Sequence, residues 1–344
     1  MKRELATRRR RGLRVLRIAL ASGGVGGAYG FAAHGAVSTG AMTGAIIGGL
    51  LAFIRFFLLG SYSQPALVSL PFPAYIALRV GIYSVVVVFV YALLAGLAGG
   101  SFDPRALNRG DVEFALSICV AANLLFGVNE LLGPGVLFAF AAGRYMRPRR
   151  EERAVLYVDL KGSTGIAERL GETSFLDFLN AFFADVTVEI EAEGGDVHKY
   201  VGDGVIAVWR ADADPARPIS AAFAAKARIA ARENIYGARF SEIPDFRAAI
   251  HAGAVVVGEL GASKKEIALI GDAMNTAARI LQAARETRCD ILISATYFDR
   301  LRVGREGLHA RRIAPVSLSG KSAQLPLVAL SLDRGGLSAA LMPT

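Results

Sequence analysis

Two aspartates stand where predicted β-strands end, and their placement suits metal-dependent phosphate chemistry. Asp159 closes the apolar run 155–160, and Asp203 lies in a Gly-Asp-Gly turn between strand-like segments 197–201 and 205–209. An Asp-Gly pair between two such segments is a strong hairpin signal. A carboxylate on a rigid strand end can bind a hard cation such as Mg²⁺. Taken alone, Asp203 is explained equally well as an ordinary turn residue.

A short polar loop follows the first of these strands and leads into a predicted helix. It contains Gly162, Ser163 and Thr164, and apolar residues at helical spacing come after it. Such a loop at a helix N-terminus offers free backbone N–H groups to phosphate. A cation on the neighbouring aspartate can bridge phosphate oxygens. The two acids and this loop together predict two-metal phosphoryl chemistry.

A third motif lies at residues 270–279 and reads Ile-Gly-Asp-Ala-Met-Asn-Thr-Ala-Ala-Arg. With Asp159 before its Gly-Ser-Thr loop and the hairpin at 194–209, it resembles the catalytic domain of class III nucleotidyl cyclases. The resemblance covers residues 153–333, and three separated motifs in the same order make it specific. It implies an α+β fold with a ferredoxin-like core, a homodimer, and conversion of ATP to 3′,5′-cyclic AMP and pyrophosphate.

The resemblance also implies how the substrate's phosphates are held. Asp159 and Asp203 would bind two divalent cations per site, Mg²⁺ or Mn²⁺. The backbone of Gly162, Ser163 and Thr164 would cradle phosphate oxygens.

Three further residues receive roles from the family pattern. Asn275 would orient the ribose, and Arg279, on the same helix face four residues later, would stabilise charge at the α-phosphate. Lys199 would contact the base, and its N–H donors suit adenine N1, which favours ATP over GTP. Without the other motifs, an exposed strand lysine and a surface salt bridge would explain Lys199 and Arg279. In the family these three residues face the metal-binding acids of the opposite subunit, so a complete site needs a homodimer.

Two positions fit the family less well. Ala268 stands where the family usually has an acceptor for the adenine amino group, and alanine has none. Lys321 stands where many members have a lysine that contacts the terminal phosphates, in a weaker local pattern. Ala268 keeps open a guanylate or mixed purine cyclase. The alternative from another class is a catalytically silent membrane receptor whose cyclase-like half only dimerises.

The composition separates an apolar first half from an ordinary globular second half. The chain has 344 residues, is 53% hydrophobic and carries a formal net charge of +9. Apolar runs at 18–33, 41–60, 74–99 and 112–132 approach the ~20 residues that cross a bilayer as a helix. We count four spans; the first run is short, so three is the competing count. Two cysteines and four histidines exclude a disulfide framework and support no zinc site.

The basic residues indicate how the spans are oriented. Eight Lys and Arg residues precede residue 18, and a second basic group follows the fourth span. The positive-inside rule therefore places both ends in the cytoplasm, with the catalytic domain attached to the inner membrane. Binding to an anionic lipid surface explains the positive charge better than binding to nucleic acid does. The expected partners are therefore the lipid bilayer and, from the family resemblance, ATP and a second copy of the chain.

Five segments make up the expected organisation, an α-helical transmembrane bundle followed by the α+β domain. They are a basic arm (1–17), the membrane domain (18–133), an amphipathic, basic helical connector (134–152), the catalytic domain (153–333) and a tail (334–344). Within the catalytic domain, periodicity predicts helices and strands in mixed order. The helices are expected at 174–193, 219–234 and 272–284, and further strands at 246–252, 255–260, 267–270, 291–293 and 325–332.

Overall fold

The structure is a computed structural model. It describes residues 2–58, 71–99, 109–132, 143, 145–263, 265–301, 308–316 and 325–332. The chain divides into two compact units, residues 1–137 and 138–344, and each is described by itself.

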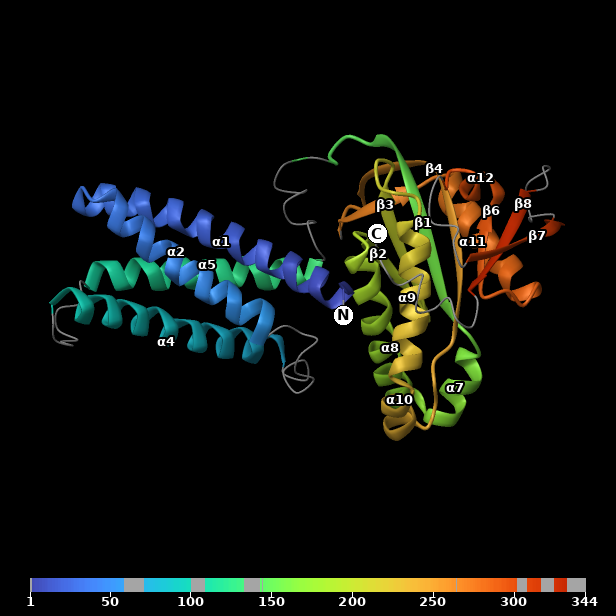
Figure 1. The fold of residues 1–344 in the computed structure, drawn as a ribbon, viewed down its shortest axis with the longest axis horizontal. Helices are drawn as coiled ribbons and strands as arrows, with labels where there is room; N and C mark the ends of the chain where they lie inside the picture. Colours follow the sequence, from blue (N-terminus) through green and yellow to red (C-terminus); the bar gives the residue numbers. More distant parts are fainter. Residues whose placement is uncertain are drawn as a thin grey trace. The chain divides into compact units, whose positions relative to one another are not determined.

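The first unit is helical in its described part apart from residues 35, 36 and 71 (Figure 1). Four of its helices contain segments long and apolar enough to cross a membrane: 12–34, 37–57, 73–97 and 109–129. Their number agrees with the four predicted spans. The elements are α1 (Lys2–His34), α2 (Val37–Phe53) with its π-helical continuation η1 (Ile54–Leu58), α4 (Phe72–Gly99) and α5 (Arg109–Leu132).

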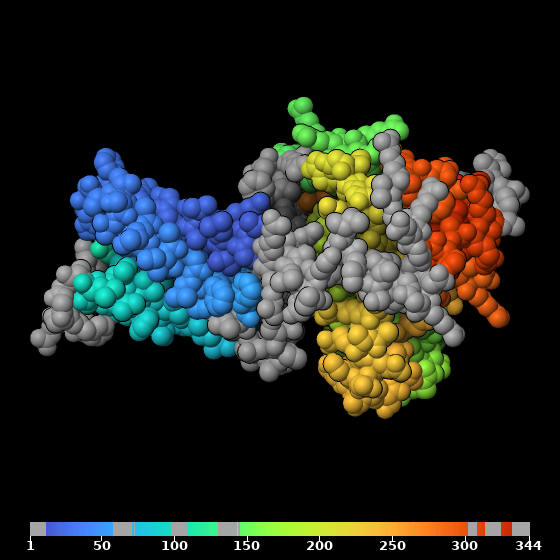
Figure 2. All heavy atoms as spheres, viewed as in Figure 1, coloured from blue at the N-terminus to red at the C-terminus, as the bar shows by residue number. Residues whose placement is uncertain are grey.

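Glycines let α1 and α2 pack closely against each other. A Cβ at Gly30 would lie 2.5 Å from the carbonyl oxygen of Ala36, and one at Gly26 would overlap the backbone of Gly40. The spheres of these two helices touch along the face shown in Figure 2. Small residues spaced by four thus form a contact face, as is common between helices in membranes.

The second unit is built on one mixed sheet with helices on both faces (Figure 1). Its described strands follow the order β2-β3-β1-β4-β6-β8-β7, and β5 pairs with β4. The strands are β1 (Arg149–Leu160), β2 (Asp196–Val201), β3 (Gly204–Arg210), β4 (Phe246–Leu260), β5 (Glu266–Ile270), β6 (Ile291–Ser294), β7 (Leu308–Val316) and β8 (Leu325–Leu332). The helices are α7 (Ser163–Leu170), α8 (Glu172–Ala192), α9 (Arg217–Ala231), α10 (Glu233–Phe240), α11 (Asp272–Glu286) and α12 (Ala295–Phe298).

The alternation of side chains along β1 decides which helix each residue meets. Leu156 and Val158 belong to the core that includes α8 and α9, which run side by side in Figure 1. Val155 belongs to the opposite core, formed with α11. Because successive side chains on a strand point to opposite faces, Asp159 lies on the face that α11 covers.

The structure differs from the expected elements in one strand that is continuous and in three elements that were not predicted. The prediction of two strands at 246–252 and 255–260 was wrong: β4 is continuous, and Gly253 pairs with Arg153 inside the β1 ladder. Here glycine permits close packing rather than a turn, since a Cβ would lie 3.3 Å from the Cβ of Ala273 in α11. Helices α10 and α12 and strand β7 were not predicted.

The expected helical connector falls partly outside the described residues. Residues 149–152, which were assigned to it, instead open β1. Tyr145 lies in a turn, and its carbonyl oxygen accepts a hydrogen bond from Glu259 N at 3.1 Å. The last part of the connector therefore belongs to the sheet.

Candidate functional site

Asp159 and Asp203 meet at one end of the β1–β3 pair. Asp159 is 6% exposed and faces Gly204, the residue after Asp203. Leu160 N donates to Asp203 O at 3.3 Å. A Cβ at Gly204 would lie 2.8 Å from the carbonyl oxygen of Val158, so glycine allows the turn to sit this close to β1. The two acids, 44 residues apart in sequence, are thus neighbours.

The polar loop begins immediately after this strand end. Gly162 has a φ of +66°, and its carbonyl oxygen accepts from Ile166 N at 3.0 Å, which starts α7. No side chain caps this terminus. The N–H groups of the first helical turn have no partner within the helix, so Ser163 and Thr164 present a set of donors beside Asp159.

Two lysines and two aspartates form an ion-pair network at the start of this loop. Lys161 Nζ bonds Asp245 Oδ2 at 2.6 Å and also bonds Asp290, while Lys226 Nζ bonds Asp290 Oδ2 at 3.0 Å and also bonds Asp245. Burial alone would raise the pKa of Asp245 and of Asp290. The hydrogen bonds from the two ammonium groups outweigh it and hold both pKa values below the ordinary range. Both carboxylates therefore stay ionised at neutral pH, and their bonds to Lys161 fix the start of the loop.

Asp159 forms an ion pair with an arginine that the motifs did not predict. Arg285, in the last turn of α11, places Nε 3.1 Å from Oδ2 and an Nη nitrogen 2.5 Å from Oδ1. Hydrogen bonding to Asp159 is the main cause that raises the pKa of Arg285, and the charge of Asp203 adds to it. The two acids thus share a site that accepts positive charge. Sequence patterns give little sign of this pair, since its members are 126 residues apart.

A second arginine lies opposite Asp159 in the β1–β4 ladder. Arg247 on β4 is the direct cross-strand partner of Asp159. Its Nε is buried and has no hydrogen-bond partner among the described residues.

The two predicted polar residues of α11 lie away from these acids. Asn275 is exposed and Arg279 is partly exposed on the outer side of the helix. Arg279 precedes Arg285 by six residues, about 9 Å along the helix axis. Within one chain, Arg285 rather than Arg279 contacts Asp159.

Lys199 has a partner that the motifs also missed. Its Nζ bonds Glu266 Oε1 at 3.2 Å and Oε2 at 3.4 Å. Ala268 follows Glu266 by two residues on β5, so both side chains project from the same face of the strand. A carboxylate therefore lies near the position where Ala268 offers no acceptor. Lys321 lies outside the described residues.

Divalent cations fit the pair Asp159 and Asp203. The described parts of the chain contain no cluster of three or more Asp, Glu, His or Cys residues that could hold a metal by itself. Mg²⁺ commonly uses one or two carboxylates and completes its shell with water and substrate phosphates. Two carboxylates beside the N-terminus of α7 meet that requirement, and the Arg285 contact shows that cationic charge is accommodated there.

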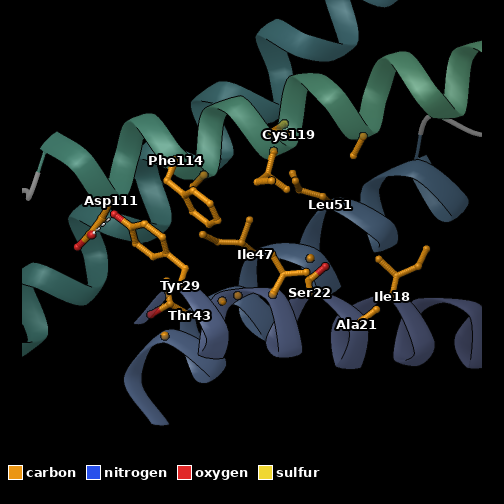
Figure 3. Close-up of a pocket in the computed structure, with 18 of the residues that line it drawn as sticks. Ile18, Ala21, Ser22, Tyr29, Thr43, Ile47, Leu51, Asp111, Phe114 and Cys119 are labelled. Carbon is orange, nitrogen blue, oxygen red and sulfur yellow. Dashed lines mark hydrogen bonds between the residues drawn. The ribbon is translucent and has the colours of Figure 1, made fainter. Parts of the chain in front are cut away.

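A separate cavity of about 490 Å³ lies within the helical unit, between α1, α2 and α5 (Figure 3). Tyr29 closes one end: its ring stacks on Phe114 at a centroid distance of 3.9 Å, and its hydroxyl donates to Asp111 Oδ1 at 3.0 Å. His34 Nε2 lies 2.7 Å from the same carboxylate oxygen. Asp111 thus ties α5 to α1 across the cavity.

Comparison with known proteins decides the family. Residues 146–329 match the family model for the adenylate and guanylate cyclase catalytic domain. The chain belongs to this cyclase family. It is 33% identical over 278 residues to adenylate cyclase 2 of Rhizobium meliloti (strain 1021), which covers 78% of this chain and 76% of that protein. The chain is therefore an enzyme of the cyclase type.

Two further comparisons concern the catalytic unit and the fold. An uncharacterized protein of Mycobacterium tuberculosis (strain ATCC 25618 / H37Rv) is 33% identical over 162 residues, which is 45% of this chain and 29% of that one. The solved structure of a bacterial light-regulated adenylyl cyclase matches with a TM-score of 0.55 at 16% identity, over 67% of this chain and 69% of that one. At this identity the match establishes a shared fold. The expected α+β cyclase fold is confirmed.

Proposed function

We propose that this cyclase is a membrane-bound adenylate cyclase, which converts ATP to 3′,5′-cyclic AMP and pyrophosphate at the interface of a homodimer. The observation that carries the proposal is the meeting of Asp159 and Asp203 beside the N-terminus of α7. Two carboxylates next to an array of N–H donors suit a metal-bound polyphosphate better than any neutral ligand.

Cyclisation needs a nucleophilic 3′-hydroxyl and relief of charge at the α-phosphate. Two Mg²⁺ or Mn²⁺ ions, when bound to Asp159 and Asp203, would lower the pKa of that hydroxyl and neutralise phosphate charge. The N–H groups of Ser163 and Thr164 would hold phosphate oxygens in place. Arg279 would donate to the α-phosphate as its charge grows, and Asn275 would hold the ribose so that its hydroxyl points at phosphorus.

The position of α11 supports a site shared between two chains. Arg279 points outward and does not reach the acids of its own chain, where Arg285 already lies. Large apolar side chains stand exposed on β2, the strand that carries Lys199, and on β4 and β5, which is unusual for a surface that faces only water. They are Tyr200 (51% exposed), Val201 (54%), Leu260 (50%) and Ile270 (59%). A second copy of the chain would cover them and bring its Arg279 to the first chain's acids.

The base pocket supports ATP and leaves one competitor. Lys199 can donate to adenine N1, and Glu266 holds its ammonium group in position. The missing acceptor at Ala268 is the specific observation that favours a guanylate or mixed purine cyclase instead. A silent receptor is disfavoured, because a non-enzyme has no chemical need for Asp159, Asp203 and Arg279 together.

The four apolar helices support attachment to the cell's inner membrane. By the positive-inside rule, the basic residues that flank them support a catalytic unit in the cytoplasm, where ATP is available. Carbonate-washed membranes should retain the full-length chain, and a reporter fused to its C-terminus should read out as cytoplasmic. An external C-terminus would contradict this topology.

Full-length protein in membranes, supplied with Mn²⁺ and either ATP or GTP, tests the activity directly. We expect cyclic AMP to be the main product by chromatography. Asp203→Asn should abolish it, whereas Asp212→Asn, the same change at a 74% exposed side chain, should not. Equal turnover of ATP and GTP would favour the mixed cyclase, and activity in Asp203→Asn would contradict the metal assignment.

A further inference from the structure

Arg285 and a divalent cation need the same carboxylate. The guanidinium of Arg285 donates to both carboxylate oxygens of Asp159, at 3.1 and 2.5 Å. Paired, two-point bonds of this kind are among the stronger polar contacts in proteins. Asp159 is buried, so few other directions of approach are open to a cation.

The two cations also repel each other. A guanidinium in contact with Asp159 would lie a few ångströms from an ion bound to the same oxygens, where like charges interact strongly. Loading of the site therefore requires Arg285 to move away or the affinity for the metal to fall.

Arg285 is placed so that it can move. Its side chain is 55% exposed, whereas that of Asp159 is 8% exposed. It stands in the last turn of α11, where the neighbouring Ala283 and Ala284, rather than Arg285, make the buried contacts. A long, solvent-exposed side chain can change rotamer without disturbing that core.

We propose that Arg285 is a tethered counter-cation that competes with the divalent metal for Asp159. The inference rests on the proposed function, because it takes Asp159 as a metal ligand. Before metal and nucleotide arrive, Arg285 offsets the repulsion between the neighbouring carboxylates of Asp159 and Asp203. It thereby raises the metal concentration that the enzyme requires. One helix then carries two arginines with different tasks: Arg285 occupies the site of its own chain, and Arg279 serves the site of its partner.

Direct metal binding by the purified full-length chain tests the proposal without any turnover. Free Mn²⁺ gives a sharp electron paramagnetic resonance signal that is lost on binding, so titration gives the dissociation constant. We expect Arg285→Gln to bind Mn²⁺ on the order of three- to tenfold more tightly than wild type, as expected for loss of a partly exposed charged competitor. Arg285→Lys keeps the positive charge but cannot donate to both carboxylate oxygens at once, so its Mn²⁺ affinity should lie between those of wild type and Arg285→Gln.

Two control variants separate this inference from the proposed function. Arg288→Gln removes the same charge from an exposed position three residues away and should leave Mn²⁺ affinity unchanged. Asp159→Ala should remove the tight site. If wild type shows no Asp159-dependent Mn²⁺ binding, the metal assignment itself fails, and this inference fails with it.

The inference alone is contradicted if binding depends on Asp159 but Arg285→Gln binds Mn²⁺ no more tightly than wild type. An equal gain in Arg288→Gln would contradict it as well, because general electrostatics would then explain the effect. Should Arg285→Gln fail to fold by circular dichroism, Arg285→Lys decides: unchanged affinity in that variant overturns the proposal.

Discussion

Mixed dimers provide a sharp test of how the site is assembled. Asp203→Ala removes a metal ligand, and Arg279→Ala removes the group proposed to stabilise the α-phosphate. Each change alone should lower activity by about 10²-fold or more, the usual cost of losing a charge-stabilising group. Both residues belong to surfaces that a partner would cover, and in one chain Arg279 does not contact the acids. Co-expression of the two variants should therefore restore activity.

The size of the recovery follows from two-fold symmetry. In a mixed dimer one site receives both damaged residues and the other receives neither. Random association makes about half of the dimers mixed, and each has one working site of two, so about a quarter of wild-type activity is expected. Different affinity tags on the two chains allow the mixed dimers to be isolated, and these should retain about half of wild-type activity.

A second pair of variants provides the matched control. Asp159→Ala and Asp203→Ala damage residues on the same side of the proposed interface. Each site of their mixed dimer would lack one acid, so no recovery is expected. Recovery with this pair, or none with Asp203→Ala and Arg279→Ala despite isolated mixed dimers, would refute the shared-site reasoning.

Three further outcomes are expected. Asp245→Asn should lower the free energy of unfolding at pH 7 by about 1 kcal/mol, the scale of exposed ion pairs. Because the folded pKa of Asp245 is depressed below its ordinary 3.8, this contribution is present above pH 3.8 and is lost as the pH falls through the folded pKa. The free energies of unfolding of the two proteins, measured by urea titration, should therefore converge in acid. Glu266→Ala should lower kcat/KM for ATP by about threefold to tenfold, because Lys199 loses the partner that orders it; unchanged kinetics would remove Glu266 from the base pocket. Asp111→Ala should reduce the thermal stability of detergent-purified protein by about 1 kcal/mol, since α1 and α5 lose a shared hydrogen-bonding group; an unaltered melting temperature would contradict that role.

Local sequence features were enough to predict the fold class and the two acids. A run of apolar residues ending in Asp159 and a Gly-Asp-Gly turn at Asp203 are patterns that a few neighbouring residues determine. The long apolar segments likewise report four helices without reference to any contact. Gly253 shows where local reading fails: the same residue serves turns and close packing, and only the β1 ladder and Ala273 distinguish the two uses.

Only the tertiary structure decided which charges meet. The alternation along β1 turns Asp159 toward α11, and the packing of α11 then brings Arg285 to it across 126 residues of sequence. The same kind of distant contact joins Glu266 to Lys199 beside Ala268. Coulombic and hydrogen-bonding energies depend on distances of a few ångströms, and residue spacing along the chain does not determine those distances. The sequence by itself therefore determined the family, the helices that can span a membrane and the two acids proposed as metal ligands, whereas the folded chain determined that Arg285 pairs with Asp159.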